Sequence, residues 1–147
     1  VQNGADTIYY GNLSRTTQGK KWTHLFPDRL RFTFLIENSL PHPSTIIPRV
    51  CFDKLGVYDE NFSIVSDWKF FLNCYLARMK FVHLSFEISH FSEGGISSTN
   101  VFLLKKERDA VIDSIPQVKK HMFRVKVYRQ IRSILPFAIS KPPQSRI

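Results

Sequence analysis

The sequence predicts an α/β fold, and three stretches of the chain carry this prediction. Residues 82–88 alternate apolar and polar side chains, which is the period of a strand with one buried face. Residues 66–79 place apolar side chains three and four positions apart, which is the period of an amphipathic helix. Residues 8–11 read Ile-Tyr-Tyr-Gly and predict a short strand that ends at the glycine.

Composition indicates one globular domain. The chain has 147 residues, 43% of them apolar and thirteen of them Phe, unlike the polar, charge-rich chains that stay disordered. Its two cysteines, Cys51 and Cys74, form no disulfide framework, and we expect reduced thiols in a cytosolic compartment. No apolar run approaches the roughly eighteen residues that span a bilayer.

The net charge of +9 is concentrated in the C-terminal third. Residues 1–100 hold ten Lys and Arg against nine Asp and Glu, while residues 101–147 hold eleven against three. Such a block is either a solvated surface or a contact for an anionic partner, phosphate backbone or acidic lipid.

The N-terminal elements follow from turn signals. After the first strand, "TTQGKK" predicts a turn and "WTHLF" the returning strand of a hairpin. Pro27 suits the first turn of a helix that runs to Asn38, and the prolines around His42 exclude regular structure there.

The later elements are bounded by caps. A short helix runs from Pro48 to Gly56, and Ser66 is expected to cap the long aromatic helix that ends at Met79. After the strand, "SEGGISSTN" predicts a loop, and Asn100 caps a helix that Pro116 ends. An amphipathic basic helix then follows, with one apolar side made of Val118, Met122, Val125, Tyr128, Ile131 and Leu135.

The candidate site residues are acids, a histidine and glycines. Asp67 stands at a helix start, where an acid is favoured by the helix dipole or serves as a catalytic carboxylate. Asp59 and Glu60 form an acidic pair in a loop, which is either solvated or part of a site. His42 either binds a ligand or satisfies a loop carbonyl. His83 and His90 are too far apart for a metal pair, so no metal site is predicted.

These motifs, taken in order, resemble a known family. The stretch "LPHPSTIIPRVCFDKLGVYDENFSIVSDWKFFL", followed by "ISHFSEGGISS", resembles the C-terminal half of the catalytic domain of family 2 glycosyltransferases. That family contains inverting enzymes of GT-A fold, among them bacterial enzymes of cell-surface polysaccharide synthesis. The resemblance spans roughly residues 5–115 and implies a mixed sheet with flanking helices.

The resemblance implies transfer of a sugar from a nucleotide donor to an acceptor hydroxyl, with inversion. It implies Asp67 as the general base, with a pKa set by the helix dipole and by desolvation from Trp68. His42, Asp59, Glu60 and Trp68 then border the acceptor and donor cleft. The glycine-rich loop becomes a candidate lid near the donor phosphates, through Gly94, Gly95 and Ser97.

One feature departs from the family pattern: the chain contains no D-x-D motif, and Asp6 does not replace it. We therefore expect residues 1–116 to be the acceptor-side half of a catalytic domain that lacks its donor-binding half, followed by a basic helical tail at 117–147. The full-length enzyme is expected to bind a nucleotide sugar and Mg²⁺ or Mn²⁺. The isolated chain is expected to be inactive and to self-associate through an exposed sheet edge.

Two other classes stay open. A non-catalytic binding module that docks on an anionic membrane through the basic tail also explains the missing motif, and it favours a cytoplasmic protein at the inner face of the membrane. A nucleic-acid binder is disfavoured, because the aromatic residues follow apolar stripes and are not interleaved with the basic ones.

Overall fold

The computed structural model describes residues 6–17, 19–92 and 100–134. The chain divides into two compact units, Val1–Leu104 and Lys105–Ile147, which are described separately. The described part of the first unit contains a four-stranded sheet and three complete α-helices, so the predicted α/β class is confirmed. The boundary predicted between residues 116 and 117 falls just after the first residue of the helix Pro116–Ile134, within the second unit.

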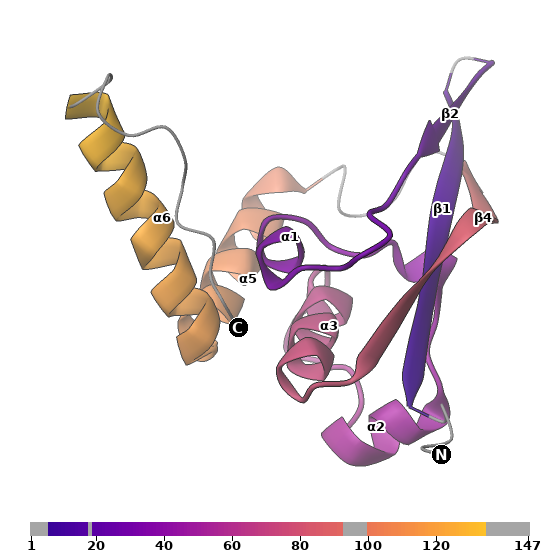
Figure 1. The fold of residues 1–147 in the computed structure, drawn as a ribbon, viewed down its shortest axis with the longest axis horizontal. Coiled ribbons are helices and arrows are strands. Elements are labelled where there is room, and N and C mark those ends of the chain that lie inside the picture. The colour runs from indigo at the N-terminus through magenta and orange to yellow at the C-terminus, as the bar shows by residue number, and fades with distance from the viewer. Residues whose placement is uncertain (1–5, 18, 93–99, 135–147) are drawn as a thin grey trace. The chain divides into compact units, whose positions relative to one another are not determined.

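Strand β1 (Thr7–Thr17) is the centre of the sheet (Figure 1). It pairs antiparallel with β2 (Lys20–His24) and with the two-residue β3 (Thr45–Ile46). It pairs in parallel with β4 (Lys80–Ser92), the longest strand. The sheet is therefore mixed, as the family resemblance implied.

The predicted hairpin is confirmed, but its first strand is longer than the sequence indicated. β1 runs through Gly11 and continues to Thr17, and the chain turns at Gly19, whose φ is 74°. Gly11 therefore does not end the strand. An added Cβ there would lie 2.7 Å from two side-chain carbons of Ile88, so glycine permits the close approach of β4.

The expectation that β4 buries one continuous face is wrong. The register shifts from Gly11 opposite Leu84 to Asn12 opposite Glu87, so the alternation is interrupted. Phe86, expected on the buried face, is 60% exposed. The irregularity turns this part of the strand outward.

Helices α1 and α2 are short. α1 (Phe32–Glu37) begins five residues later than the predicted start at Pro27, which lies in the preceding irregular segment. α2 (Arg49–Leu55) is confirmed: Pro48 precedes it, and Gly56 follows it with a φ of 83°, a backbone angle that glycine adopts without a side-chain clash.

Helix α3 (Ser66–Leu76) is confirmed in its position, but both of its predicted ends are corrected. Val65 occupies the N-cap position, and Ser66 is already helical. At the other end Arg78 adopts a φ of 63°, and Met79 lies beyond the helix. The Arg78 amide donates to the Tyr75 carbonyl and the Met79 amide to the Cys74 carbonyl, which together form a Schellman motif.

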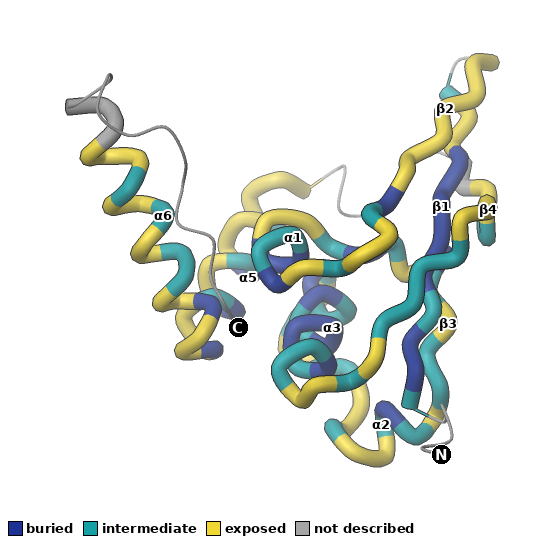
Figure 2. Tube along the Cα trace, viewed as in Figure 1, coloured by how far each residue is buried: buried dark blue, intermediate teal, exposed yellow. Residues whose placement is uncertain are grey.

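The core of the first unit joins α3 to α1 on one side of the sheet (Figures 1 and 2). Trp68 is 1% exposed, and its indole nitrogen donates to the Leu35 carbonyl oxygen at 2.5 Å. Both cysteines, Cys51 and Cys74, are buried free thiols. The burial of Trp68 and its bond to Leu35 hold the first turn of α3 against α1.

The proline-rich segment before α2 is more ordered than expected. His42–Ser44 form a single turn of 3₁₀ helix, η1, which leads into β3. The Ser44 hydroxyl is fully buried and lies 2.6 Å from the Ser89 hydroxyl on β4. This contact anchors the segment that carries His42.

Helices α5 (Val101–Ser114) and α6 (Pro116–Ile134) follow. Asn100 caps α5 as predicted, since its side-chain oxygen accepts from the Leu103 amide at 3.0 Å. The helix ends before Pro116, also as predicted, and the second predicted helix is α6. Within residues 6–17, 19–92 and 100–134, no helix has the length and apolar content needed to cross a membrane.

Candidate functional site

The carboxyl group of Asp67 lies in the first turn of α3, as the sequence predicted. It is half-buried, and one of its oxygens accepts a hydrogen bond from the Trp68 amide at 2.6 Å. Among the residues that the structure describes, no lysine or arginine forms an ion pair with it. The carboxyl group is thus held by a backbone amide and not by any lysine or arginine that the structure describes.

Burial raises the pKa of Asp67 above its ordinary value of 3.8. The Trp68 amide and the charge of His42 act in the opposite direction, because both favour the ionised carboxylate, but burial is the largest effect. A carboxyl group with a raised pKa is a stronger base than an ordinary aspartate, which makes this position a candidate functional site.

His42 and Tyr58 both interact electrostatically with this carboxyl group. The His42 Nε2 atom and the Tyr58 hydroxyl are 2.9 Å apart, and the two rings meet edge to face with their centroids at 5.7 Å. Burial, followed by the charge of Asp67, raises the pKa of Tyr58 to about 12. The phenol is therefore neutral at physiological pH and available as a hydrogen-bonding group.

This arrangement brings together His42 and Asp67, which the sequence selected, and adds Tyr58, which it missed. Tyr58 stands only nine residues before Asp67 in the sequence, inside the loop that precedes α3. Its role depends on tertiary contacts that no local pattern reveals.

An aromatic cluster positions Tyr58. Its ring packs edge to face on Phe52 of α2 at 5.4 Å and on Phe70 of α3 at 5.3 Å between centroids. Phe52 and Phe70 stack on each other at 4.6 Å. The Tyr58 ring is therefore held by both helices, and its hydroxyl points toward His42 with little conformational freedom.

Asp59 fastens the same loop to α3. Its carboxylate accepts from the Lys69 ammonium at 2.5 Å and from both the backbone and side-chain nitrogens of Asn61. The bond to Lys69 and the bonds to Asn61 lower the pKa of Asp59 to about 2. Glu60 is exposed beside it. Asp59 thus holds the loop against α3, and its carboxylate is already paired with Lys69.

Two further predicted cleft contacts differ in outcome. Trp68 is enclosed in the core, so its ring is not available to a ligand, and its hydrogen bond with Asp67 is through the backbone amide. Gly94, Gly95 and Ser97 lie outside the residues that the structure describes.

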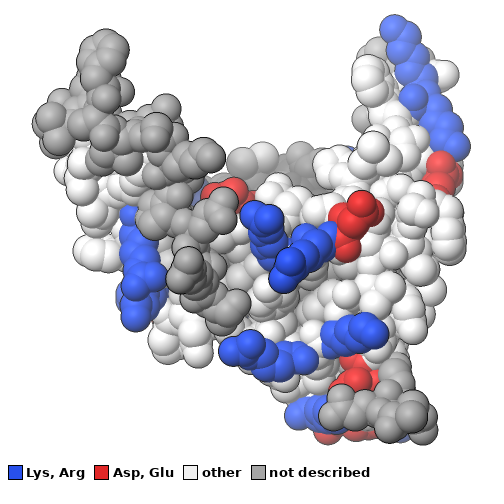
Figure 3. Space-filling view, in the orientation of Figure 1, with Lys and Arg blue, Asp and Glu red and all other residues white. Residues whose placement is uncertain are grey.

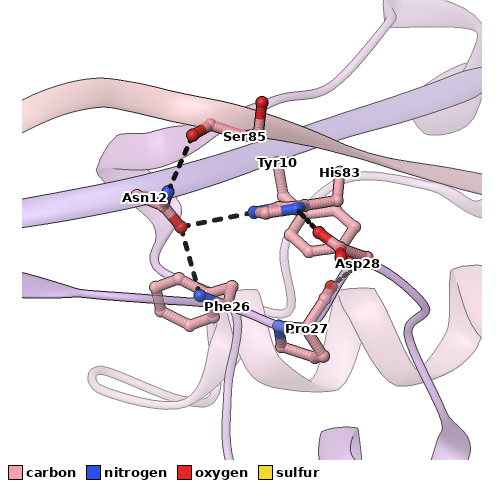
Figure 4. Close-up of polar contacts among 7 residues, drawn as sticks. All are labelled: Tyr10, Asn12, Phe26, Pro27, Asp28, His83 and Ser85. Carbon is pink, nitrogen blue, oxygen red and sulfur yellow. Dashed lines mark hydrogen bonds and ion pairs between the residues drawn. The ribbon is translucent and has the colours of Figure 1, made fainter.

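A second polar cluster joins β1, β4 and the segment after β2 (Figure 4). The His83 Nδ1 atom lies 2.7 Å from the Asp28 carboxylate, and Nε2 lies 3.3 Å from the Asn12 side-chain oxygen. Asn12 also accepts from the Phe26 amide and donates to the Ser85 carbonyl. Both ring nitrogens of His83 and both side-chain polar atoms of Asn12 are engaged within this cluster, so we interpret it as a structural connection between these segments.

A third cluster superficially resembles a nucleophile with its base. The Ser14 hydroxyl lies 2.6 Å from His90 Nδ1 and donates to Glu87 at 2.7 Å. However, Ser14 is fully buried, and Glu87 contacts the serine rather than orienting the histidine. The geometry does not fit nucleophilic catalysis, and the cluster fastens β1 to β4.

The described residues do not form a metal site. Within residues 6–17, 19–92 and 100–134, no three side chains among His, Cys, Asp and Glu converge in a way that could hold an ion. His83 and His90 are each engaged in a separate hydrogen-bonded cluster.

Comparisons with known proteins identify no relative of this chain: no family model, no curated protein and no solved structure matches it.

Proposed function

We propose that this chain is the acceptor-side half of the catalytic domain of an inverting glycosyltransferase of GT-A fold, and that Asp67 is its general base. The observation that carries the proposal is the state of this carboxyl group. It is half-buried, has a raised pKa, is held at one oxygen by the Trp68 amide and interacts electrostatically with His42 and Tyr58.

The reaction needs one proton acceptor. The Asp67 carboxylate takes the proton of the acceptor hydroxyl while the hydroxyl oxygen attacks the anomeric carbon of the sugar. The bond from that carbon to the nucleoside diphosphate breaks on the opposite side, and the diphosphate leaves with the electron pair. Burial that raises the pKa of Asp67 strengthens it for this role.

His42 and Tyr58 are suited to position the acceptor. A neutral phenol and an imidazole offer both donors and acceptors to sugar hydroxyls, and the aromatic cluster holds the Tyr58 ring in a fixed orientation. In this proposal Asp59 positions Tyr58 through the loop, and Glu60 borders the site from the exposed side.

The nucleotide-sugar donor and a divalent metal, Mg²⁺ or Mn²⁺, belong to the part of the enzyme that carries the D-x-D motif. The metal would assist departure of the diphosphate. The residues described here do not supply a ligand set for it. No step assigned to Asp67, His42 or Tyr58 passes through the metal.

The sheet suggests where the donor half would join. Among the strands that the structure describes, β4 pairs only with β1, so no described strand lies along its other edge. We propose that this edge pairs with strands of the longer enzyme or, in the isolated chain, with a second copy. The proposed setting is the cytoplasmic face of a membrane in polysaccharide synthesis.

The test uses a protein with the complete reading frame and a panel of nucleotide-sugar donors, with release of nucleoside diphosphate as the readout. Asp67→Asn is expected to lower kcat by about 10²–10⁴-fold with little change in KM, since it removes general-base catalysis. Asp53→Asn, at an exposed acid of α2, is the matched control and should stay near wild type.

Two results would contradict the proposal. Full activity in Asp67→Asn would favour a binding module without a catalytic aspartate. Donor turnover by the 147-residue chain alone would show that the donor half is not needed.

A further inference from the structure

We propose that α6 binds the surface of an anionic lipid membrane. In this arrangement Phe123, Val127 and Ile131 enter the headgroup region, and the basic side chains of the same helix contact lipid phosphates. The proposal rests on α6 alone and does not depend on the proposed transferase activity.

The apolar part of this surface is one strip along α6. Phe123, Val127 and Ile131 are four residues apart, so they lie on one face of the helix. They are 68%, 36% and 41% exposed, and together with Arg124 and Tyr128 they line a single shallow groove. Exposed apolar side chains in such a row mark an interaction surface.

This strip is not the face that packs into the protein. Val118 is fully buried and Met122 and Val125 are half-buried, and these three occupy the opposite side of α6. Val118 and Val127 are nine residues apart, which places them about 180° apart around a helix. The sequence predicted a single apolar side that included Ile131, whereas the structure separates two.

The charges of α6 all have one sign. The helix contains six basic residues and no acidic residue: Lys119, Lys120, Arg124, Lys126, Arg129 and Arg132. Figure 3 shows basic atoms exposed on this helix. A cationic helix with an exposed apolar strip is complementary to an anionic amphiphile.

A lipid surface fits this combination better than nucleic acid does. Phosphate backbone would satisfy the basic residues but would leave the aliphatic Val127 and Ile131 in water. Bases would need aromatic side chains in series to stack on, and the strip has only Phe123 among its exposed members.

The experiment measures partitioning of the 147-residue chain onto vesicles of phosphatidylcholine, with and without phosphatidylglycerol, by co-sedimentation. Binding is expected only with the anionic lipid and is expected to weaken as salt rises. The double variant Phe123→Ser, Val127→Ser should lower the partition coefficient by at least about tenfold. Leu25→Ser, at a 72% exposed leucine of the first unit, is the matched control and should bind like wild type.

A second variant reports on insertion itself. Trp22→Phe combined with Phe123→Trp places an indole on the strip and leaves only the buried Trp68 as background. Its emission should shift to the blue with anionic vesicles and be quenched by brominated lipid. Equal binding of wild type and the double serine variant would overturn the proposal. So would an unshifted emission together with displacement from vesicles by an oligonucleotide.

Discussion

The His42 imidazole and the Tyr58 hydroxyl lie 2.9 Å apart, and the two residues come from segments on opposite sides of α2 in the sequence. Asp67 interacts electrostatically with both: the charge of His42 lowers its pKa, and its own charge raises the pKa of Tyr58. Three segments therefore converge on one carboxyl group. This coupling can be measured directly in the 147-residue chain.

The first prediction concerns His42→Gln. Removing the imidazolium charge should raise the pKa of Asp67 further, because His42 is one of the groups that favour the ionised carboxylate. Carbon NMR of the Asp67 carboxyl group during an acid titration measures the shift. His24→Gln, at an exposed position of β2, is the control and should leave the pKa unchanged. An unchanged pKa of Asp67 in His42→Gln would show that the two residues do not interact.

The second prediction is that Asp67→Asn stabilises the folded chain at pH 7. The folded pKa of Asp67 lies above the unfolded value of 3.8, so stability falls as pH rises from about 3.8 through the folded pKa. The amide avoids this cost and should add about 0.5–2 kcal/mol to the free energy of unfolding.

Urea unfolding at neutral pH and below pH 3.8 checks this prediction. The advantage of the amide should vanish at a pH where Asp67 is protonated in both the folded and the unfolded chain. A loss of stability at pH 7 would mean that the favourable helix dipole, about 0.3–1 kcal/mol, outweighs the desolvation of the carboxylate.

Local signals predicted the elements of this fold well, and tertiary contacts account for the misses. Gly56 was correctly predicted to end α2, and Asn100 was correctly predicted to cap the start of α5. Gly11 was misread as a strand end, because nothing in the local pattern reveals how closely Ile88 of the neighbouring strand β4 approaches it. Trp68 was read as a cleft residue because its neighbour Asp67 suggested a site, but the hydrogen bond to Leu35 places the indole in the core.

The third prediction concerns the acid Asp59. Its pKa is lowered from 3.8 to about 2, mainly by the bond to Lys69, so the stability it contributes is present above pH 3.8 and is lost as pH falls toward 2. Asp59→Asn should therefore unfold more easily than wild type at neutral pH and equally at pH 2. Thermal unfolding at both pH values measures the difference. Glu60→Gln, at the exposed neighbouring acid, should behave like wild type at both.

The fourth prediction uses the end of α3. Arg78 has a φ of 63°, a conformation that costs a residue with a side chain about 1–2 kcal/mol and costs glycine little. Arg78→Gly should raise the free energy of unfolding by about 0.5–1 kcal/mol after the extra entropy of the unfolded glycine is subtracted. Arg31→Gly, at an extended residue with a φ of −116°, should give no gain. Equal effects of the two substitutions would argue against the Schellman motif.

The fifth prediction tests the contact between β1 and β4. In Gly11→Ala the new methyl group would lie 2.7 Å from Ile88 carbons and 3.0 Å from the Phe86 carbonyl oxygen. Ile88 must move, and overpacking of this kind costs about 1–3 kcal/mol. Shortening the neighbour as well, in Gly11→Ala, Ile88→Ala, should cost less than the sum of the two single changes, because the smaller side chain leaves room for the methyl group. The free energy of unfolding is measured by chemical denaturation for wild type, Gly11→Ala, Ile88→Ala and the double variant. Strict additivity of the two single effects would show that the two residues do not touch.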